Sequence, residues 1–144
     1  MRDDRLQLRA GLLELVLSPS VGGSIQRFDW VGSAGSAPIL RPCNSAPKNV
    51  LEAASFPLVP YVNRIRGGRF SFRGNTVRIR PNMPGDVSPI HGQGGVGAWE
   101  VHEAGVMAVS GMTITNSGEW PWAYEARQEF VVDDSGLSLA LTCR

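Results

Sequence analysis

Three residues in the segment from Phe56 to Gly95 have side chains that suit binding chemistry: Asn63, Arg64 and His91. The guanidinium of an arginine presents several hydrogen-bond donors in a fixed plane, and an imidazole titrates near neutral pH. His91 stands in an Ile-His-Gly turn within a glycine-rich stretch. Brought together in a glycine-lined cleft, these groups would suit a polyhydroxylated ligand such as a sugar.

The size and charge of the chain limit the classes of partner. Its 144 residues match one ordinary domain, and its 42% apolar content is enough to build a core. The formal net charge of +1 argues against duplex DNA or an anionic membrane as an electrostatic partner. We therefore expect residues 1–144 to form a single domain that binds neither nucleic acid nor membrane.

Cysteine usage and the N-terminal segment bear on the compartment. Cys43 and Cys143 are the only cysteines, and neither lies in a cluster with metal-ligand spacing. We expect two buried, reduced thiols rather than a disulfide. The first residues lack a cationic start followed by a long apolar run, and no window reaches membrane-spanning length. These features predict a cytoplasmic protein.

The pattern along the chain predicts short strands and tight turns. Scattered among the residues are 17 glycines and 10 prolines, which leave few stretches long enough for a helix. Alternation is clearest near the end, where Leu137, Leu139 and Leu141 point the same way. The preceding Asp133-Asp134-Ser135-Gly136 predicts a hairpin turn that closes onto a strand over residues 124–132.

Two more hairpins are expected, and the whole is predicted to be an antiparallel, mostly-β protein. One covers residues 69–79, with its turn at Gly74-Asn75, and the other joins 99–102 to 106–109 across Ala104-Gly105. Earlier strands are expected at residues 7–10, 12–17 and 24–30. Two stretches rich in Gly, Ser or Pro are expected to be surface loops, 32–56 and 80–99; the first could also border a site beside Asn63.

Several separated motifs resemble, in their order, the N-terminal half of the aldose 1-epimerase, or galactose mutarotase, family. They are LVPYVNRIRGGRFSFRG, PNMPGDVSPIHGQG, Trp99 and EWPWAYEARQEFVVDDSGLSLAL. The resemblance implies an all-β antiparallel sandwich of the galactose mutarotase type, here a partial supersandwich, whose open face binds a sugar. It also implies an isomerase that interconverts the α and β anomers of an aldose by acid/base ring opening, without a metal or redox cofactor.

The resemblance also implies roles for individual residues. Asn63 and Arg64 match the Asn-Arg pair that binds sugar hydroxyls, and His91 matches the first of two functional histidines, which contacts the substrate and supports catalysis. The expected substrate is a monosaccharide, an aldohexose, and the arginine-rich surroundings leave a sugar phosphate open as well.

The chain departs from the family pattern in its length. Three functional residues of the family lie beyond the position that matches Arg144: the second histidine (the acid), a sugar-binding Asp and a Glu (the base). His102 does not match the acid histidine. The chain alone is therefore expected to be an incomplete, inactive epimerase or a non-catalytic carbohydrate-binding relative. A half sandwich also exposes strand edges, so self-association or pairing with a C-terminal half is expected.

Two aromatic groups allow other interpretations. Arginines interleaved with Phe70 and Phe72 could form a stacking platform for nucleic acid, but the near-neutral net charge favours placing these phenylalanines in the core. Trp120, Trp122 and Tyr124 could stack on a sugar ring, or simply pack in the core or at a strand edge.

Overall fold

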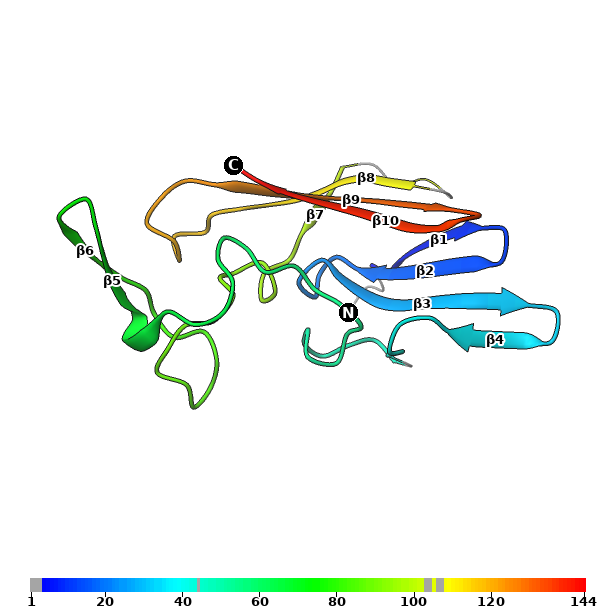
Figure 1. Cartoon of the computed structure of the whole chain (residues 1–144), viewed down its shortest axis with the longest axis horizontal. Coiled ribbons are helices and arrows are strands. Elements are labelled where there is room, and N and C mark those ends of the chain that lie inside the picture. Colours follow the sequence, from blue (N-terminus) through cyan, green and yellow to red (C-terminus); the bar gives the residue numbers. More distant parts are fainter. Residues whose placement is uncertain (1–3, 44, 103–104, 106–107) are drawn as a thin grey trace.

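The regular structure is almost entirely antiparallel β-sheet, as predicted (Figure 1). The computed structural model describes residues 4–43, 45–102, 105 and 108–144. Two four-stranded sheets face each other, and a two-stranded hairpin projects at one end. A single turn of 3-10 helix, Arg66–Gly68, precedes this hairpin. Nowhere in the described ranges does a helix reach the length and apolar character that crossing a bilayer requires.

The first sheet contains the N-terminal strands in sequence order. Its members are β1 (Leu6–Ala10), β2 (Leu13–Ser18), β3 (Ser24–Gly32) and β4 (Gly35–Pro38). The first three confirm the predicted strands to within two residues at each end. Strand β4 corrects the prediction that residues 32–56 are all loop. Its residues have low strand propensity, and pairing with the end of β3 forms the strand despite this.

The second sheet has the order β10-β9-β8-β7. Its members are β7 (Glu100–Val101), β8 (Ala108–Thr115), β9 (Glu125–Asp133) and β10 (Gly136–Cys143). The C-terminal hairpin is confirmed, because Asp133 pairs with Gly136 and its side chain accepts the N–H groups of Ser135 and Gly136. Strands β7 and β8 pair antiparallel, but Val101 faces Met112, so the register differs from the one predicted. Ala104, in the predicted turn, lies outside the described residues.

The projecting hairpin consists of β5 (Arg69–Phe72) and β6 (Asn75–Arg78), as predicted, with its turn shifted by one residue to Arg73-Gly74. Both turn residues have positive φ, 50° and 79°, as a tight two-residue hairpin requires. The expected core placement of Phe70 and Phe72 is wrong. Their rings pack instead on Trp120 and Trp122, and Phe72 is 45% exposed.

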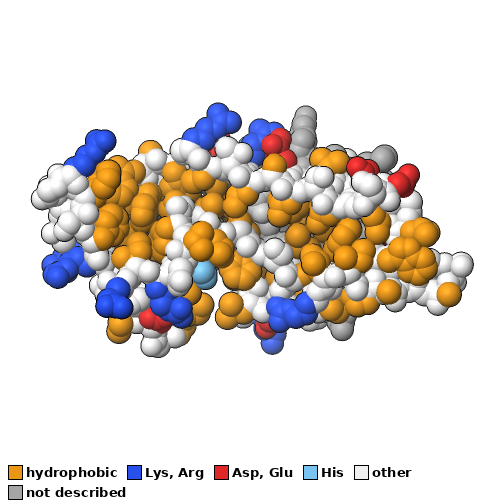
Figure 2. Space-filling model, viewed as in Figure 1, with side chains coloured by type: hydrophobic (Ala, Val, Ile, Leu, Met, Phe, Trp, Pro, Cys, Tyr) orange, Lys and Arg blue, Asp and Glu red, His pale blue; other side chains and the backbone are white. Residues whose placement is uncertain are grey.

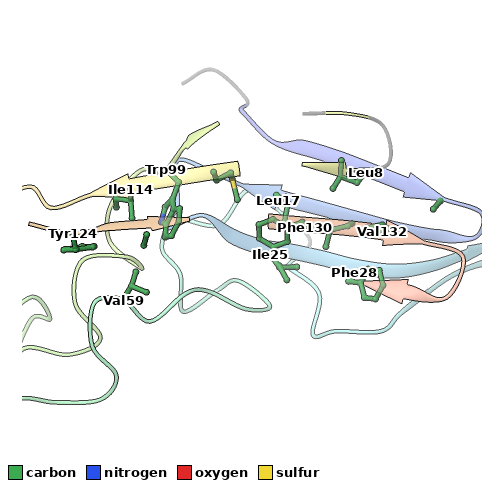
Figure 3. Close-up of a cluster of buried hydrophobic side chains, with 14 residues drawn as sticks. Leu8, Leu17, Ile25, Phe28, Val59, Trp99, Ile114, Tyr124, Phe130 and Val132 are labelled. Atoms are coloured by element: carbon green, nitrogen blue, oxygen red, sulfur yellow. The ribbon is translucent and has the colours of Figure 1, made fainter. Parts of the chain in front are cut away.

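The main core lies between the two sheets (Figure 3). Alternation along β9 buries Ala126, Gln128, Phe130 and Val132 on one face, against Leu15, Leu17 and other side chains of the first sheet. Tyr124 also belongs to this core, which leaves Trp120 and Trp122 as the outer part of the aromatic motif.

Both cysteines are free thiols. Cys43 is buried as predicted, but Cys143 is exposed, which corrects the expectation of two buried thiols. The difference arises because Cys143 ends β10, which lies at an edge of its sheet.

Candidate functional site

Two segments far apart in sequence run side by side and bring Asn63, Arg64 and His91 together. Arg64 and Ile90 form an antiparallel bridge. On either side of it, the Ile65 N–H donates to the Pro89 carbonyl at 3.0 Å and the His91 N–H donates to the Asn63 carbonyl at 3.1 Å. The three residues singled out from the sequence are thus neighbours in space.

The backbone of the site is strained at two of these residues. Asn63 has φ 65° and His91 has φ 59°, in the left-handed region that few residues other than glycine adopt. Asparagine and histidine tolerate this region better than most side chains. Such conformations cost free energy and persist only where the surroundings hold them. A strained backbone at Asn63 and His91 therefore needs neighbours that fix it.

Asn82 and Gly92 provide this support. The Asn82 amide donates to the carbonyls of Ile90 and Gly92 at 2.7 and 2.9 Å, and its oxygen accepts the Ile90 N–H at 2.8 Å. Gly92 has φ 66°, and a Cβ added there would lie 2.2 Å from the Val59 carbonyl oxygen. Asn82 was not predicted from the sequence, because nothing in the loop pattern shows that its side chain holds both sides of His91.

The hydrogen bonding of His91 determines which ring nitrogen carries the proton. Its Nδ1 accepts the Asn63 backbone N–H at 2.8 Å, so the neutral ring is protonated on Nε2. Partial burial and, secondarily, the positive charge of Arg64 lower the pKa of His91 below its ordinary 6.5. The Phe56 and His91 rings pack in a T-shaped arrangement, with ring centroids 6.4 Å apart. His91 is therefore neutral at pH 7, with an Nε2–H donor.

Arg64 is oriented by a carboxylate that the sequence did not single out. Its Nε donates to Asp86 Oδ2 at 2.6 Å, and Asp86 Oδ1 accepts the Ser88 N–H at 2.9 Å. The hydrogen bond from Arg64 is the main cause that lowers the pKa of Asp86. No hydrogen bond within the described part of the chain uses the terminal nitrogens of Arg64, whose side chain is 53% exposed. These nitrogens remain available to a ligand.

The three residues lie on an exposed surface that borders two cavities. One, of about 290 Å³, is lined by Phe56, Val62 and the apolar side of β10. The other, of about 370 Å³, is lined by Tyr61, Gly92, Glu119, Trp120 and others. Neither cavity is lined by Arg64 or His91, which differs from the expectation of a single cleft containing both. Figure 2 shows hydrophobic side chains in a band across this view of the molecule, with basic side chains along its margins.

The aromatic motif contributes Trp120 to the wall of the larger cavity. Its ring centroid lies 5.3 Å from that of Tyr61. His102 has another environment, in contact with the Thr113 hydroxyl.

Comparison with known proteins identifies related sequences and folds. A family model described as aldose 1-epimerase matches residues 4–144. The Escherichia coli K12 protein YphB, described as uncharacterized, is 37% identical over 93 residues, which are 65% of this chain and 30% of that protein. A crystal structure from the same organism, assigned provisionally as an aldose 1-epimerase, superposes with a TM-score of 0.83 at 29% identity, covering 96% of this chain and 45% of that one.

Two more distant structures share the fold. A galactose mutarotase-like protein from Clostridium acetobutylicum gives a TM-score of 0.72 at 18% identity, over 95% of this chain and 44% of that one. Galactose 1-epimerase from Lactobacillus acidophilus gives 0.69 at 15% identity, over 99% of this chain and 46% of that one. The chain thus spans less than half the length of these solved relatives. By the family model that matches nearly all of its residues, the chain belongs to the aldose 1-epimerase family.

Proposed function

We propose that Asn63, Arg64 and His91 bind the hydroxyl groups of a monosaccharide, an aldohexose, and form one part of an aldose 1-epimerase site. The observation that carries the proposal is the pair of reciprocal bonds between Asn63 and His91, which fixes the imidazole beside Arg64. The Arg64 terminal nitrogens and the His91 Nε2–H then supply donors from neighbouring positions. A planar, permanently charged guanidinium orients hydroxyls without exchanging protons with them.

Anomer interconversion needs two proton transfers. A base removes the proton from the anomeric hydroxyl while an acid protonates the ring oxygen; the ring opens, the carbonyl rotates and the ring closes on the other face. Neutral His91 can donate its Nε2–H to a sugar oxygen and so support this step. The acid histidine and base glutamate that the family resemblance implies correspond to positions beyond Arg144. We therefore assign sugar binding to this chain and the main proton transfers to groups outside it.

Polarimetry of freshly dissolved α-glucose or α-galactose tests this division of roles. Acid and base groups each contribute about 100 to 10,000-fold to a rate, so the 144-residue chain should leave mutarotation close to its spontaneous rate. A full-length mutarotase is the positive control. A short chain as fast as this control would contradict the proposal.

A carbohydrate-binding relative without catalysis is the second candidate function. It is favoured by the same feature, a set of binding donors without the implied acid and base. If a longer form that contains the present residues bound sugar but did not accelerate mutarotation, this second function would replace the first.

A further inference from the structure

The cavity of about 370 Å³ is lined by segments that are separated in the sequence. Its lining residues come from 60–61, 79–82, 92–97 and 117–120. The last of these segments lies at the end of the molecule from which the β5–β6 hairpin projects, since Trp120 packs on Phe70 (Figure 1). Sites for small molecules usually have volumes of about 300–1,000 Å³, so this cavity is large enough to hold one.

Two amide side chains hold the walls of this cavity in place. The Gln93 amide, which is buried, donates to the Thr115 carbonyl at 2.7 Å, and its oxygen accepts the N–H and the hydroxyl of Ser117, each at 3.3 Å. The Asn116 amide donates to the carbonyls of Trp120 and Trp122 at 2.6 and 2.8 Å. A cavity whose walls are fixed in advance loses little conformational entropy when a ligand binds.

Two charged groups of opposite sign line the cavity and remain unpaired. The Arg80 guanidinium and the Glu119 carboxylate form no hydrogen bond or ion pair with any residue that the structure describes. The Tyr61 hydroxyl is a third polar group in the wall. Partial burial and, more weakly, the negative charge of Glu119 raise the pKa of Tyr61, against the effect of a hydrogen bond with the Gly92 backbone. The hydroxyl therefore keeps its proton at neutral pH.

The remaining wall is largely apolar and narrows the class of ligand. Pro60, Ile79, Pro81 and the rings of Tyr61 and Trp120 contribute to it. A ligand for this cavity needs an apolar face for these side chains, acceptors for a guanidinium and donors for a carboxylate. A pyranose has all three, because its C–H groups form an apolar face and its hydroxyls both donate and accept.

We propose that this cavity is a second saccharide site, in which Arg80 and Glu119 bind the hydroxyls of a pyranose and Tyr61 and Trp120 contact its C–H face. The site is separate from the one proposed above, because neither Arg64 nor His91 lines the cavity. A neutral ligand is favoured over a zwitterion such as an amino acid. Both charged side chains are exposed, and ion pairs with exposed groups contribute little, whereas burial against the apolar wall contributes in proportion to its area.

Titration of the isotopically labelled 144-residue chain with methyl α-glucoside or methyl α-galactoside tests this site. The two glycosides are locked as single anomers, so no ring opening accompanies binding. We expect saturable shifts of the Trp120 indole N–H and of the amides of Ser117 and Glu119. Glu119→Ala and Arg80→Ala should each weaken the binding seen by these signals several-fold. Glu100→Ala and Arg78→Ala are the matched controls, since both residues are exposed and neither lines the cavity.

The same titration of Arg64→Ala separates this site from the first one. The shifts of Trp120, Ser117 and Glu119 should persist in that variant with unchanged affinity, whether or not the signals of His91 respond to sugar. Glycine, a zwitterion without an apolar ring, should leave these signals unchanged. The second site would be overturned by the absence of saturable shifts with both glycosides, by their loss in Arg64→Ala, by a response to glycine in preference to the glycosides, or by equal affinity of Glu119→Ala and Glu100→Ala.

Discussion

At the residue scale, the ion pair between Arg64 and Asp86 determines where the guanidinium points. The bond uses Nε, which leaves the terminal nitrogens directed elsewhere. Asp86→Ala should release Arg64 and weaken sugar binding several-fold, because the side chain then loses entropy when it binds. Asp86→Asn keeps an oxygen that can accept the Nε–H. Its sugar affinity should therefore lie between those of the wild type and of Asp86→Ala. Titration calorimetry compares the three proteins; wild-type affinity in the alanine variant would show that Asp86 does not position Arg64.

The lowered pKa of His91 predicts a pH dependence. Protonation of His91 at Nδ1 would place a second donor against the Asn63 N–H and so disturb the imidazole that is proposed to bind sugar. Because the folded-state pKa lies below 6.5, sugar affinity should stay constant from pH 8 to about 6.5 and fall only below that pH. Over the same window the unfolded chain binds more protons than the folded one, so the free energy of unfolding also decreases as pH falls. His91→Gln should remove both trends. Tighter binding on acidification through pH 6.5 would contradict this account.

Sequence motifs predicted Asn63, Arg64 and His91 as candidate site residues, and the structure places them together, but the motifs did not indicate the residues that hold them. Asp86 and Asn82 lie in a proline-rich loop, where neither alternation nor spacing indicates which side chains turn inward. Their contacts depend on how residues 80–92 fold back on residues 59–65. That path is set by tertiary contacts such as the bond from Gly94 N–H to the Val59 carbonyl.

At the element scale, two glycines with similar backbone angles should respond differently to alanine. Gly74 has φ 79° with open space around its missing Cβ, so Gly74→Ala should cost only the left-handed strain, about 1–2 kcal/mol. Gly92 has the same strain and a Cβ position 2.2 Å from the Val59 carbonyl oxygen. Gly92→Ala should therefore destabilise the protein more than Gly74→Ala in chemical denaturation and should also weaken sugar binding. Equal costs would show that the His91 loop can move freely.

The strands themselves were largely predictable, because turn chemistry and alternation act locally. The Asp133-Asp134-Ser135-Gly136 turn fixed the register of β9 with β10. Strand β4 was missed because its residues form a strand only through pairing with β3. The alternation of Phe70 and Phe72 correctly indicated a strand but could not show which apolar layer receives them. In the structure this layer is the Trp120 and Trp122 cluster rather than the core between the sheets.

At the scale of the whole molecule, the candidate site lies outside the core that the two sheets enclose. The two sheets enclose the core on their inner faces, while Phe56, whose ring packs against that of His91, lines the smaller cavity together with Leu139 of β10. The chain spans less than half of its solved relatives.

The most direct test of the account is a titration of the isotopically labelled 144-residue chain with glucose and galactose, followed by amide chemical shifts. We predict saturable shifts of Asn63, Arg64 and His91. Arg64→Ala should weaken binding by about tenfold or more, since hydrogen bonds to a charged group contribute about 1.5–3 kcal/mol. Arg66→Ala, which removes an exposed arginine nearby, should leave the affinity unchanged. Shifts confined to other regions, or equal affinity in the two variants, would contradict the proposed sugar site.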